Sequence, residues 1–102
     1  MNPLPPGAML GILGGGQLGR MSAMAAARLG YRCHIYAPGA DEPGMQVAAA
    51  RTVAAFEDRE ALARFADQVD VVTFEFENVP AETVEILSRR VTCRPGEKAL
   101  GI

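Results

Sequence analysis

The fold is decided by the stretch Met9-Leu10-Gly11-Ile12-Leu13-Gly14-Gly15-Gly16-Gln17-Leu18-Gly19-Arg20. A short apolar run, typical of a buried strand, ends at three consecutive glycines, and a helix is predicted over residues 17–29. Because glycine has no Cβ, a ligand can approach such a turn closely. The helix that follows points its unpaired N–H groups and the positive end of its dipole at the same place. The stretch therefore predicts a strand, an anion-sized turn and a helix.

Strands and helices alternate along the rest of the chain. Strands are predicted over residues 9–13, 32–37, 51–54, 71–74 and 91–93. The first helix places Leu18, Met21, Ala25 and Leu29 on one apolar face, and Gly30 is expected to end it in a left-handed conformation. A short helix is predicted over residues 45–50.

Two further helices are predicted. Asp58 is expected to cap a helix that carries Leu62, Phe65, Ala66 and Val69 at the spacing of a buried stripe. Pro80 is expected in the first turn of the last helix, which ends near Arg89 and Arg90. The alternation predicts an α/β fold, a three-layer open parallel sheet of Rossmann-like type with strand order about 3-2-1-4-5.

Length and composition exclude several classes of protein. A chain of 102 residues with 49% hydrophobic residues predicts one domain, over residues 9–102, after a leader over residues 1–8. The net charge of −2 disfavours nucleic acid as a partner. The sequence contains no membrane-length apolar run and no signal peptide, which indicates a cytoplasmic protein. Cys33 and Cys93 form no C-x-x-C pair, so free thiols in a reducing compartment are expected.

The glycine cluster leaves more than one interpretation open. Gly14, Gly16 and Gly19 satisfy G-x-G-x-x-G, the fingerprint of a dinucleotide-binding module. Such a module needs an acidic residue at the end of its second strand, and that strand ends in Tyr36-Ala37-Pro38. An NAD(P)-binding module is therefore the alternative rather than the preferred interpretation. A third interpretation is that the glycines serve only close packing.

A second group of polar residues follows the fourth strand. Glu75, Glu77 and Asn78 come directly after Phe74, and the switch point of a 3-2-1-4 sheet brings this loop opposite the glycine loop. Carboxylates facing an anion-binding turn suggest a sugar phosphate, although solvated loop charges remain an alternative. His34, the single histidine, is expected to be structural, and no catalytic residue and no metal ligand is predicted.

Both motifs together resemble one family. The segments Gly14-Gly15-Gly16-Gln17-Leu18-Gly19-Arg20-Met21 and Val72-Thr73-Phe74-Glu75-Phe76-Glu77-Asn78-Val79-Pro80 look like those of the 5-(carboxyamino)imidazole ribonucleotide synthases, which are ATP-grasp enzymes of purine biosynthesis. The resemblance covers residues 9–102 and implies the pre-ATP-grasp domain of such an enzyme. It implies an ATP-dependent ligase that carboxylates 5-aminoimidazole ribonucleotide with bicarbonate.

The resemblance also assigns residues and partners. Relatives acting on glycinamide ribonucleotide imply substrate contacts at Gln17, Leu18 and Glu75, and the crevice adds Gly15, Gly16, Glu77 and Asn78 as candidates. ATP and Mg²⁺ are implied for the full-length enzyme, bound outside this chain by the central and C-terminal ATP-grasp domains. We expect those domains and a second subunit as partners, and no carboxylase activity from this chain alone.

Overall fold

The computed structural model describes residues 7–14, 16–39, 41–74 and 79–95. Its elements, in chain order, are β1 (Met9–Leu13), α1 (Gln17–Arg28), β2 (Arg32–Ala37), the 3₁₀ helix η1 (Pro43–Gln46), β3 (Ala50–Val53), α2 (Arg59–Asp67), β4 (Val71–Phe74), α3 (Ala81–Ser88) and β5 (Cys93–Pro95). All four strand pairs are parallel and the order is β3-β2-β1-β4-β5, which confirms the predicted fold class and strand order.

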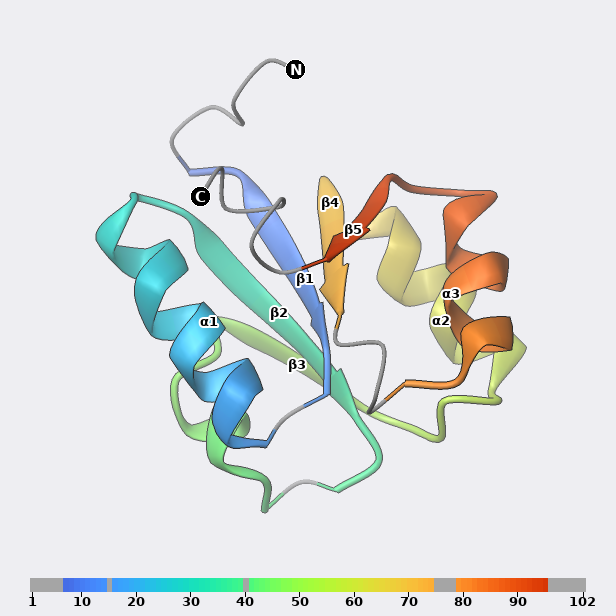
Figure 1. Ribbon diagram of the computed structural model, residues 1–102, viewed down its shortest axis with the longest axis horizontal. Helices are drawn as coiled ribbons and strands as arrows, with labels where there is room; N and C mark the ends of the chain where they lie inside the picture. The colour runs from blue at the N-terminus through green and yellow to red at the C-terminus, as the bar shows by residue number, and fades with distance from the viewer. Residues whose placement is uncertain (1–6, 15, 40, 75–78, 96–102) are drawn as a thin grey trace.

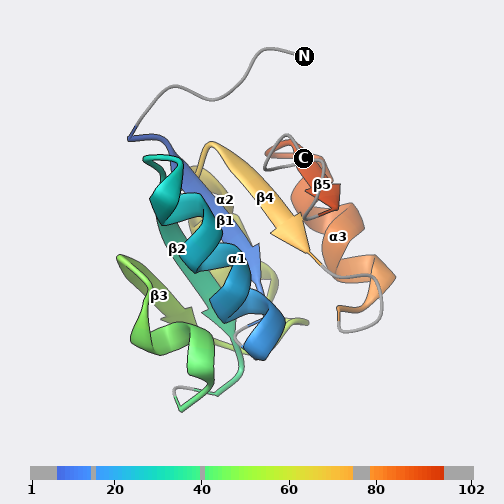
Figure 2. The same cartoon turned by 60° about the vertical axis from the view of Figure 1, so that its left-hand side comes forward.

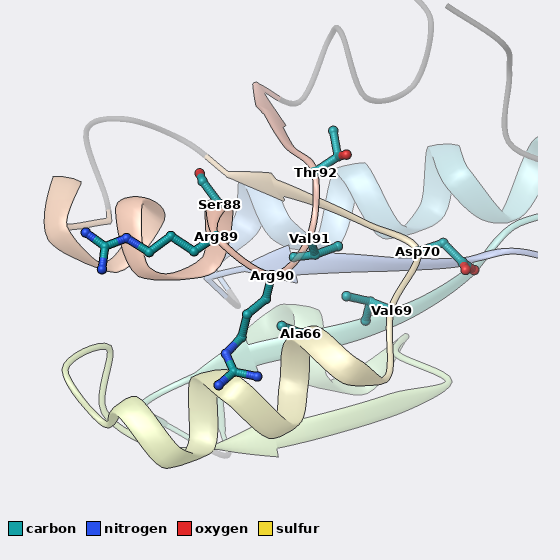
Figure 3. Close-up of a pocket in the computed structure, with 8 residues that line it drawn as sticks. All are labelled: Ala66, Val69, Asp70, Ser88, Arg89, Arg90, Val91 and Thr92. Atoms are coloured by element: carbon teal, nitrogen blue, oxygen red, sulfur yellow. The ribbon is translucent and has the colours of Figure 1, made fainter.

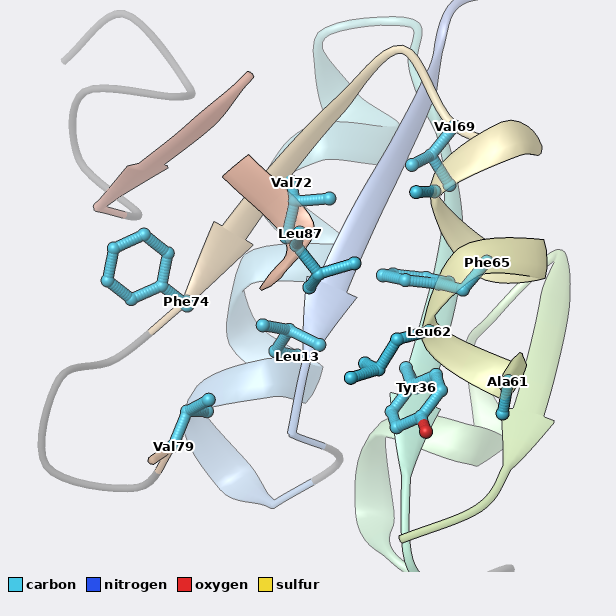
Figure 4. Close-up of a cluster of buried hydrophobic side chains, with 11 residues drawn as sticks. Leu13, Tyr36, Ala61, Leu62, Phe65, Val69, Val72, Phe74, Val79 and Leu87 are labelled. Atoms are coloured by element: carbon cyan, nitrogen blue, oxygen red, sulfur yellow. The ribbon is translucent and has the colours of Figure 1, made fainter. Parts of the chain in front are cut away.

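The helices cover both faces of the sheet (Figure 1). On one face, α1 packs its buried Ala23 and Ala26 against Leu10, Ile12 and Ile35. On the other face, α2 and α3 cover a larger apolar cluster (Figure 4). That cluster consists of Leu13, Tyr36, Ala61, Leu62, Phe65, Ala66, Val69, Val72, Phe74, Val79 and Leu87. The molecule therefore has the three predicted layers, with a core on each side of the sheet.

Helix ends follow local chemistry. The Asp58 carboxylate accepts a hydrogen bond from the Ala61 N–H at 3.0 Å, so Asp58 is the N-cap of α2 as predicted. Gly30 has φ of 89° and follows the C-cap of α1, and the N–H groups of Gly30 and Tyr31 donate to the carbonyls of Ala27 and Ala26. This pattern is a Schellman motif, and it confirms the left-handed glycine expected there.

The apolar face predicted for α1 is not the face that packs on the sheet. Met21 and Leu29 are 63% and 52% exposed, whereas the small residues Ala23 and Ala26 face the sheet. Close approach of the helix to the strands selects small side chains for the buried face, so the large apolar residues stay outside. The side chain of Leu18 lies outside the described residues.

Four other local predictions were wrong. In place of the helix expected over residues 45–50, the structure has the 3₁₀ helix η1, which begins earlier, at Pro43, because proline has a fixed φ. Strand β3 begins at Ala50, one residue before its predicted start. The last strand is Cys93–Pro95 rather than 91–93, because the N–H groups of Arg90 and Val91 both donate to the Leu87 carbonyl and delay extension. Pro80 is the N-cap of α3 and precedes its first turn.

Candidate functional site

The carboxyl ends of β1 and β4 meet at one edge of the sheet. The two strands are parallel neighbours, with Leu10 beside Val71 and Ile12 beside Thr73. Strand order runs outward in opposite directions from this pair, toward β2 on one side and β5 on the other, so the pair is the topological switch point. The carboxyl ends of β1 and β4 therefore lie at the same edge of the sheet (Figure 2). The adjacency of the two strands agrees with the predicted strand order, and the crevice between their loops stays a prediction.

The glycines of the first loop have three different environments. Gly14 has φ of 100°, a value that side chains rarely adopt, and its N–H donates to the Tyr36 carbonyl at 2.8 Å. Gly19 lies so close to the Gly14 carbonyl that a Cβ there would collide with backbone. Gly16 has an ordinary φ of −71° and nothing within 4 Å of a Cβ. Neither backbone conformation nor packing therefore requires a glycine at position 16.

Gly16 also starts α1 without a side-chain cap. The first backbone bond of the helix runs from the Arg20 N–H to the Gly16 carbonyl at 2.9 Å, and no acidic residue lies in the first turn. Among the described residues, no side chain caps the N–H groups at the start of this helix, where the dipole favours an anion. Gln17 and Leu18 are the first two residues of α1, and their side chains lie outside the described part.

The remaining predicted site residues lie outside the described residues. These are Gly15 in the first loop and Glu75, Glu77 and Asn78 in the second. The described segments show that β1 and β4, the strands that precede these residues, are parallel neighbours. The individual contacts of these four residues stay predictions.

The end of β2 lacks a free acidic group. Ala37 is fully buried and Pro38 follows it, as the sequence indicates. The acids that follow are Asp41, which is exposed, and Glu42, whose Oε2 accepts a hydrogen bond from the Gly39 N–H at 3.0 Å. Glu42 therefore holds its own loop together, and the ribose-binding acid of a dinucleotide site is missing from this position.

The buried polar groups behind the loop are structural. His34 is 2% exposed, its Nε2 lies 2.7 Å from the Thr52 Oγ1, and its ring meets Phe65 edge-on. Burial lowers the pKa of His34. Tyr36 donates its hydroxyl to the Ala55 carbonyl, and burial above all, with the nearby carboxylates, raises its pKa to about 12. The structure therefore confirms the prediction that His34 is a core residue.

Arg20 was missed by the sequence interpretation. Its Nε is buried and is the one buried side-chain nitrogen or oxygen without a hydrogen-bond partner in the part of the chain that the structure describes. Arginine in a helix is ordinarily solvated, so the sequence carried no signal for this. The Arg20 guanidinium therefore makes no hydrogen bond through its Nε within the described part of the chain.

One hollow lined by described residues lies away from the switch-point edge of the sheet. It is shallow, has a volume of about 530 Å³ and lies at the opposite, amino edge of the sheet, where α2 and α3 end and β4 and β5 begin (Figure 3). It is lined by Ala66, Val69, Asp70, Ser88, Arg89, Arg90, Val91 and Thr92. Figure 3 shows the Arg89 side chain pointing away from Val69 and Val91, and Arg89 is paired with Glu85 at 3.2 Å. The polar groups that line this hollow do not converge on a common point.

Neither a metal-ligand cluster nor a helix of membrane-spanning length occurs in the described residues. Among them, no three histidine, cysteine, aspartate or glutamate side chains are grouped to hold a metal ion. Cys33 and Cys93 are both free thiols, as predicted. No helix in the described ranges has the length and apolar character needed to cross a bilayer.

The fold and the switch-point edge of the sheet together define a class of protein domain. An open parallel α/β sheet with a glycine turn at its switch point is a Rossmann-like ligand-binding domain. The model of the ribonucleotide synthetase preATP-grasp domain matches residues 8–102, and the chain belongs to this family.

Similar proteins agree with this assignment. The chain is 50% identical over 99 residues to the N5-carboxyaminoimidazole ribonucleotide synthase of Brucella melitensis, covering 97% of this chain and 27% of that protein. It is 52% identical over 97 residues to a bifunctional purine synthesis protein of Dictyostelium discoideum, covering 95% of this chain and 10% of that protein.

Solved structures are similar as well. The Staphylococcus aureus N5-carboxyaminoimidazole synthetase complexed with ADP has a TM-score of 0.85 at 35% identity, over 98% of this chain and 27% of that one. The Aspergillus clavatus enzyme in complex with ADP and 5-aminoimidazole ribonucleotide has a TM-score of 0.73 at 33% identity, over 93% and 26%. The chain thus spans about a quarter of the synthases that it matches, and the predicted family resemblance is confirmed.

Proposed function

We propose that this chain is the substrate-side domain of an ATP-dependent ligase that carboxylates 5-aminoimidazole ribonucleotide with bicarbonate in purine biosynthesis. The family, the names of the relatives and a relative solved with that ribonucleotide support the proposal. The observation in this chain that supports it most is Gly16, a glycine with open space around it at a helix start that no described side chain caps. A ligand approaching the backbone would account for that residue.

The proposed site consists of two halves. Gly15, Gly16, Gln17 and Leu18 form the half on the glycine loop, where the N–H groups at the start of α1 stabilise an anionic group. Glu75, Glu77 and Asn78 form the half that follows β4, where carboxylate and amide oxygens accept hydrogen bonds from ribose hydroxyls. Because β1 and β4 are adjacent, one ligand can reach both halves. The role of these residues is to bind and orient the ribonucleotide.

The reactive machinery is proposed to lie outside this chain. The relatives are about four times longer, and some were solved with ADP or ATP. The described residues hold no acidic cluster fit for Mg²⁺, so we assign no step through that ion to this chain. The proposal places ATP and Mg²⁺ on further ATP-grasp domains, with a homodimer as the assembly. The two free thiols agree with a cytoplasmic location.

Ligand binding tests the proposal directly. Calorimetric titration of the chain with 5-aminoimidazole ribonucleotide, NAD and NADP should give binding only for the ribonucleotide. Gly16→Val should weaken that binding at least about tenfold, a loss of roughly 1.4 kcal/mol, because the added side chain fills the approach. Its extended backbone (φ −71°, ψ −165°) accommodates valine, so the protein should stay folded, with a small loss of thermal stability because valine is a poorer N-cap than glycine. Micromolar binding of NAD or NADP would instead support the dinucleotide alternative.

Activity is tested in a chimera. Replacing the corresponding segment of the Brucella melitensis synthase, which is 50% identical, with this chain should retain ribonucleotide-dependent ATP hydrolysis. Glu75→Gln in the chimera should reduce kcat/KM for the ribonucleotide without changing folding, because a carboxylate acceptor is lost. The chain by itself is expected to hydrolyse no ATP. A folded chimera with no activity, or an unchanged kcat/KM after Glu75→Gln, contradicts the respective assignment.

A further inference from the structure

The outer face of α1 carries large apolar side chains that the fold does not use. Met21, Met24 and Leu29 are 63%, 42% and 52% exposed. A single exposed apolar residue needs no explanation, but three on one side of a helix of 12 residues form a patch. Figure 2 shows α1 lying along the outside of the sheet.

These residues form two parallel rows on the helix surface. Positions four apart lie in one row, so Arg20, Met24 and Arg28 form one row and Met21, Ala25 and Leu29 the other. The second row has a small residue between two large ones. Such a surface accepts the side chains of another helix laid along it, and methionine adapts to many apolar shapes.

The charge on this helix has one sign. Arg20 and Arg28 are its only charged residues, and neither forms an ion pair within the described part of the chain. The two arginines lie eight positions apart, which is about 12 Å along the helix axis. A partner helix would neutralise both with carboxylates about two turns apart.

Charge also argues against two other occupants. Two copies of α1 related by a two-fold axis would bring arginine toward arginine in either direction, with no acid on α1 to compensate. An anionic membrane surface would attract two arginines but repel a chain with a net charge of −2. We propose that the Met21–Met24–Leu29 face of α1 is a docking surface for an amphipathic helix with an apolar stripe and acidic flanks. The inference does not depend on the proposed ligase function.

A pair of synthetic peptides tests this surface. One helical peptide carries a leucine stripe flanked by glutamates about two turns apart, and the other carries lysines in their place. Titration of the full chain should show binding of the glutamate peptide alone. Arg28→Glu should weaken it at least about tenfold, and Met21→Ser combined with Met24→Ser should do the same.

Matched controls separate docking from general charge and folding. Arg90→Glu makes the same charge change at an exposed residue on the opposite face, beyond α3, and should leave the affinity unchanged. All substituted positions are exposed, so circular dichroism should not change. Equal binding of both peptides, or an equal effect of Arg90→Glu, overturns the proposal. So does a dimer in sedimentation that Met21→Ser dissolves, or binding of the chain to phosphatidylserine vesicles that Met21→Ser abolishes.

Discussion

At the scale of single residues, the glycines of the first loop divide by physical role. Gly14 provides a left-handed backbone conformation, Gly19 lets α1 approach the loop closely, and Gly16 leaves open space. The sequence pattern treats all three alike, because a G-x-G-x-x-G match carries no coordinates. The structure therefore separates what the glycines do for folding from what they leave available for a ligand.

Gly19→Ala is expected to destabilise the protein by about 1–3 kcal/mol, because the new methyl group collides with the Gly14 carbonyl and forces the backbone apart. Urea denaturation at neutral pH measures the change in the free energy of unfolding. Gly16→Ala is the matched control, since its methyl group meets nothing within 4 Å. Equal stability of the two variants would contradict the packing role of Gly19.

His34 is expected to make stability depend on pH. Burial lowers its pKa below the usual value of 6.5, so the unfolded chain binds its proton more readily than the folded one. The free energy of unfolding should therefore be highest above pH 6.5 and fall as the pH drops below it. Because the chain has one histidine, His34→Gln should abolish the change between pH 7 and 5, although it lowers stability overall. Urea denaturation at pH 7, 6 and 5 measures this, and an unchanged slope in His34→Gln contradicts it.

At the scale of elements, the periodic spacing of apolar residues predicted the buried face of α2 correctly and that of α1 incorrectly. Leu62, Phe65 and Ala66 are buried as their spacing indicates, because α2 packs large side chains into a wide space above the sheet. Helix α1 lies closer to the strands, and only small residues such as Ala23 and Ala26 fit there. A periodic pattern records where apolar residues lie on a helix, whereas the distance to the sheet decides which side is buried.

Asp58→Ala should cost about 1 kcal/mol of stability, because the Ala61 N–H loses its acceptor at the start of α2. Thermal or urea unfolding measures the loss. Asp67→Ala is the control at the other end of the same helix, where a negative charge opposes the helix dipole. It should be neutral or slightly stabilising, and an equal loss in both variants would mean that capping is not the cause.

At the scale of the whole molecule, the two cysteines report on cooperative unfolding. Cys33 is 4% exposed, and burial raises the pKa of its thiol to about 11, so thiolate is scarce at pH 8. We expect a disulfide reagent to modify half-buried Cys93 in the native protein and Cys33 only after unfolding. In Cys93→Ser, the labelling rate of Cys33 should rise with urea in step with the population of unfolded protein. Rapid labelling of Cys33 in native Cys93→Ser would contradict a cooperative core.

The amino-acid sequence by itself determined the alternation of strands and helices, the parallel sheet and its order, the Asp58 cap and the family. These follow from local periodicity, turn chemistry and motif identity, all of which are properties of neighbouring residues. Only the tertiary structure decided which face of α1 is buried, which glycine has free space and where β5 begins. Those features depend on distances that the folded structure sets, such as the approach of Gly19 to the Gly14 carbonyl and of α1 to the sheet. Close packing sets such distances, and no single stretch of sequence encodes them.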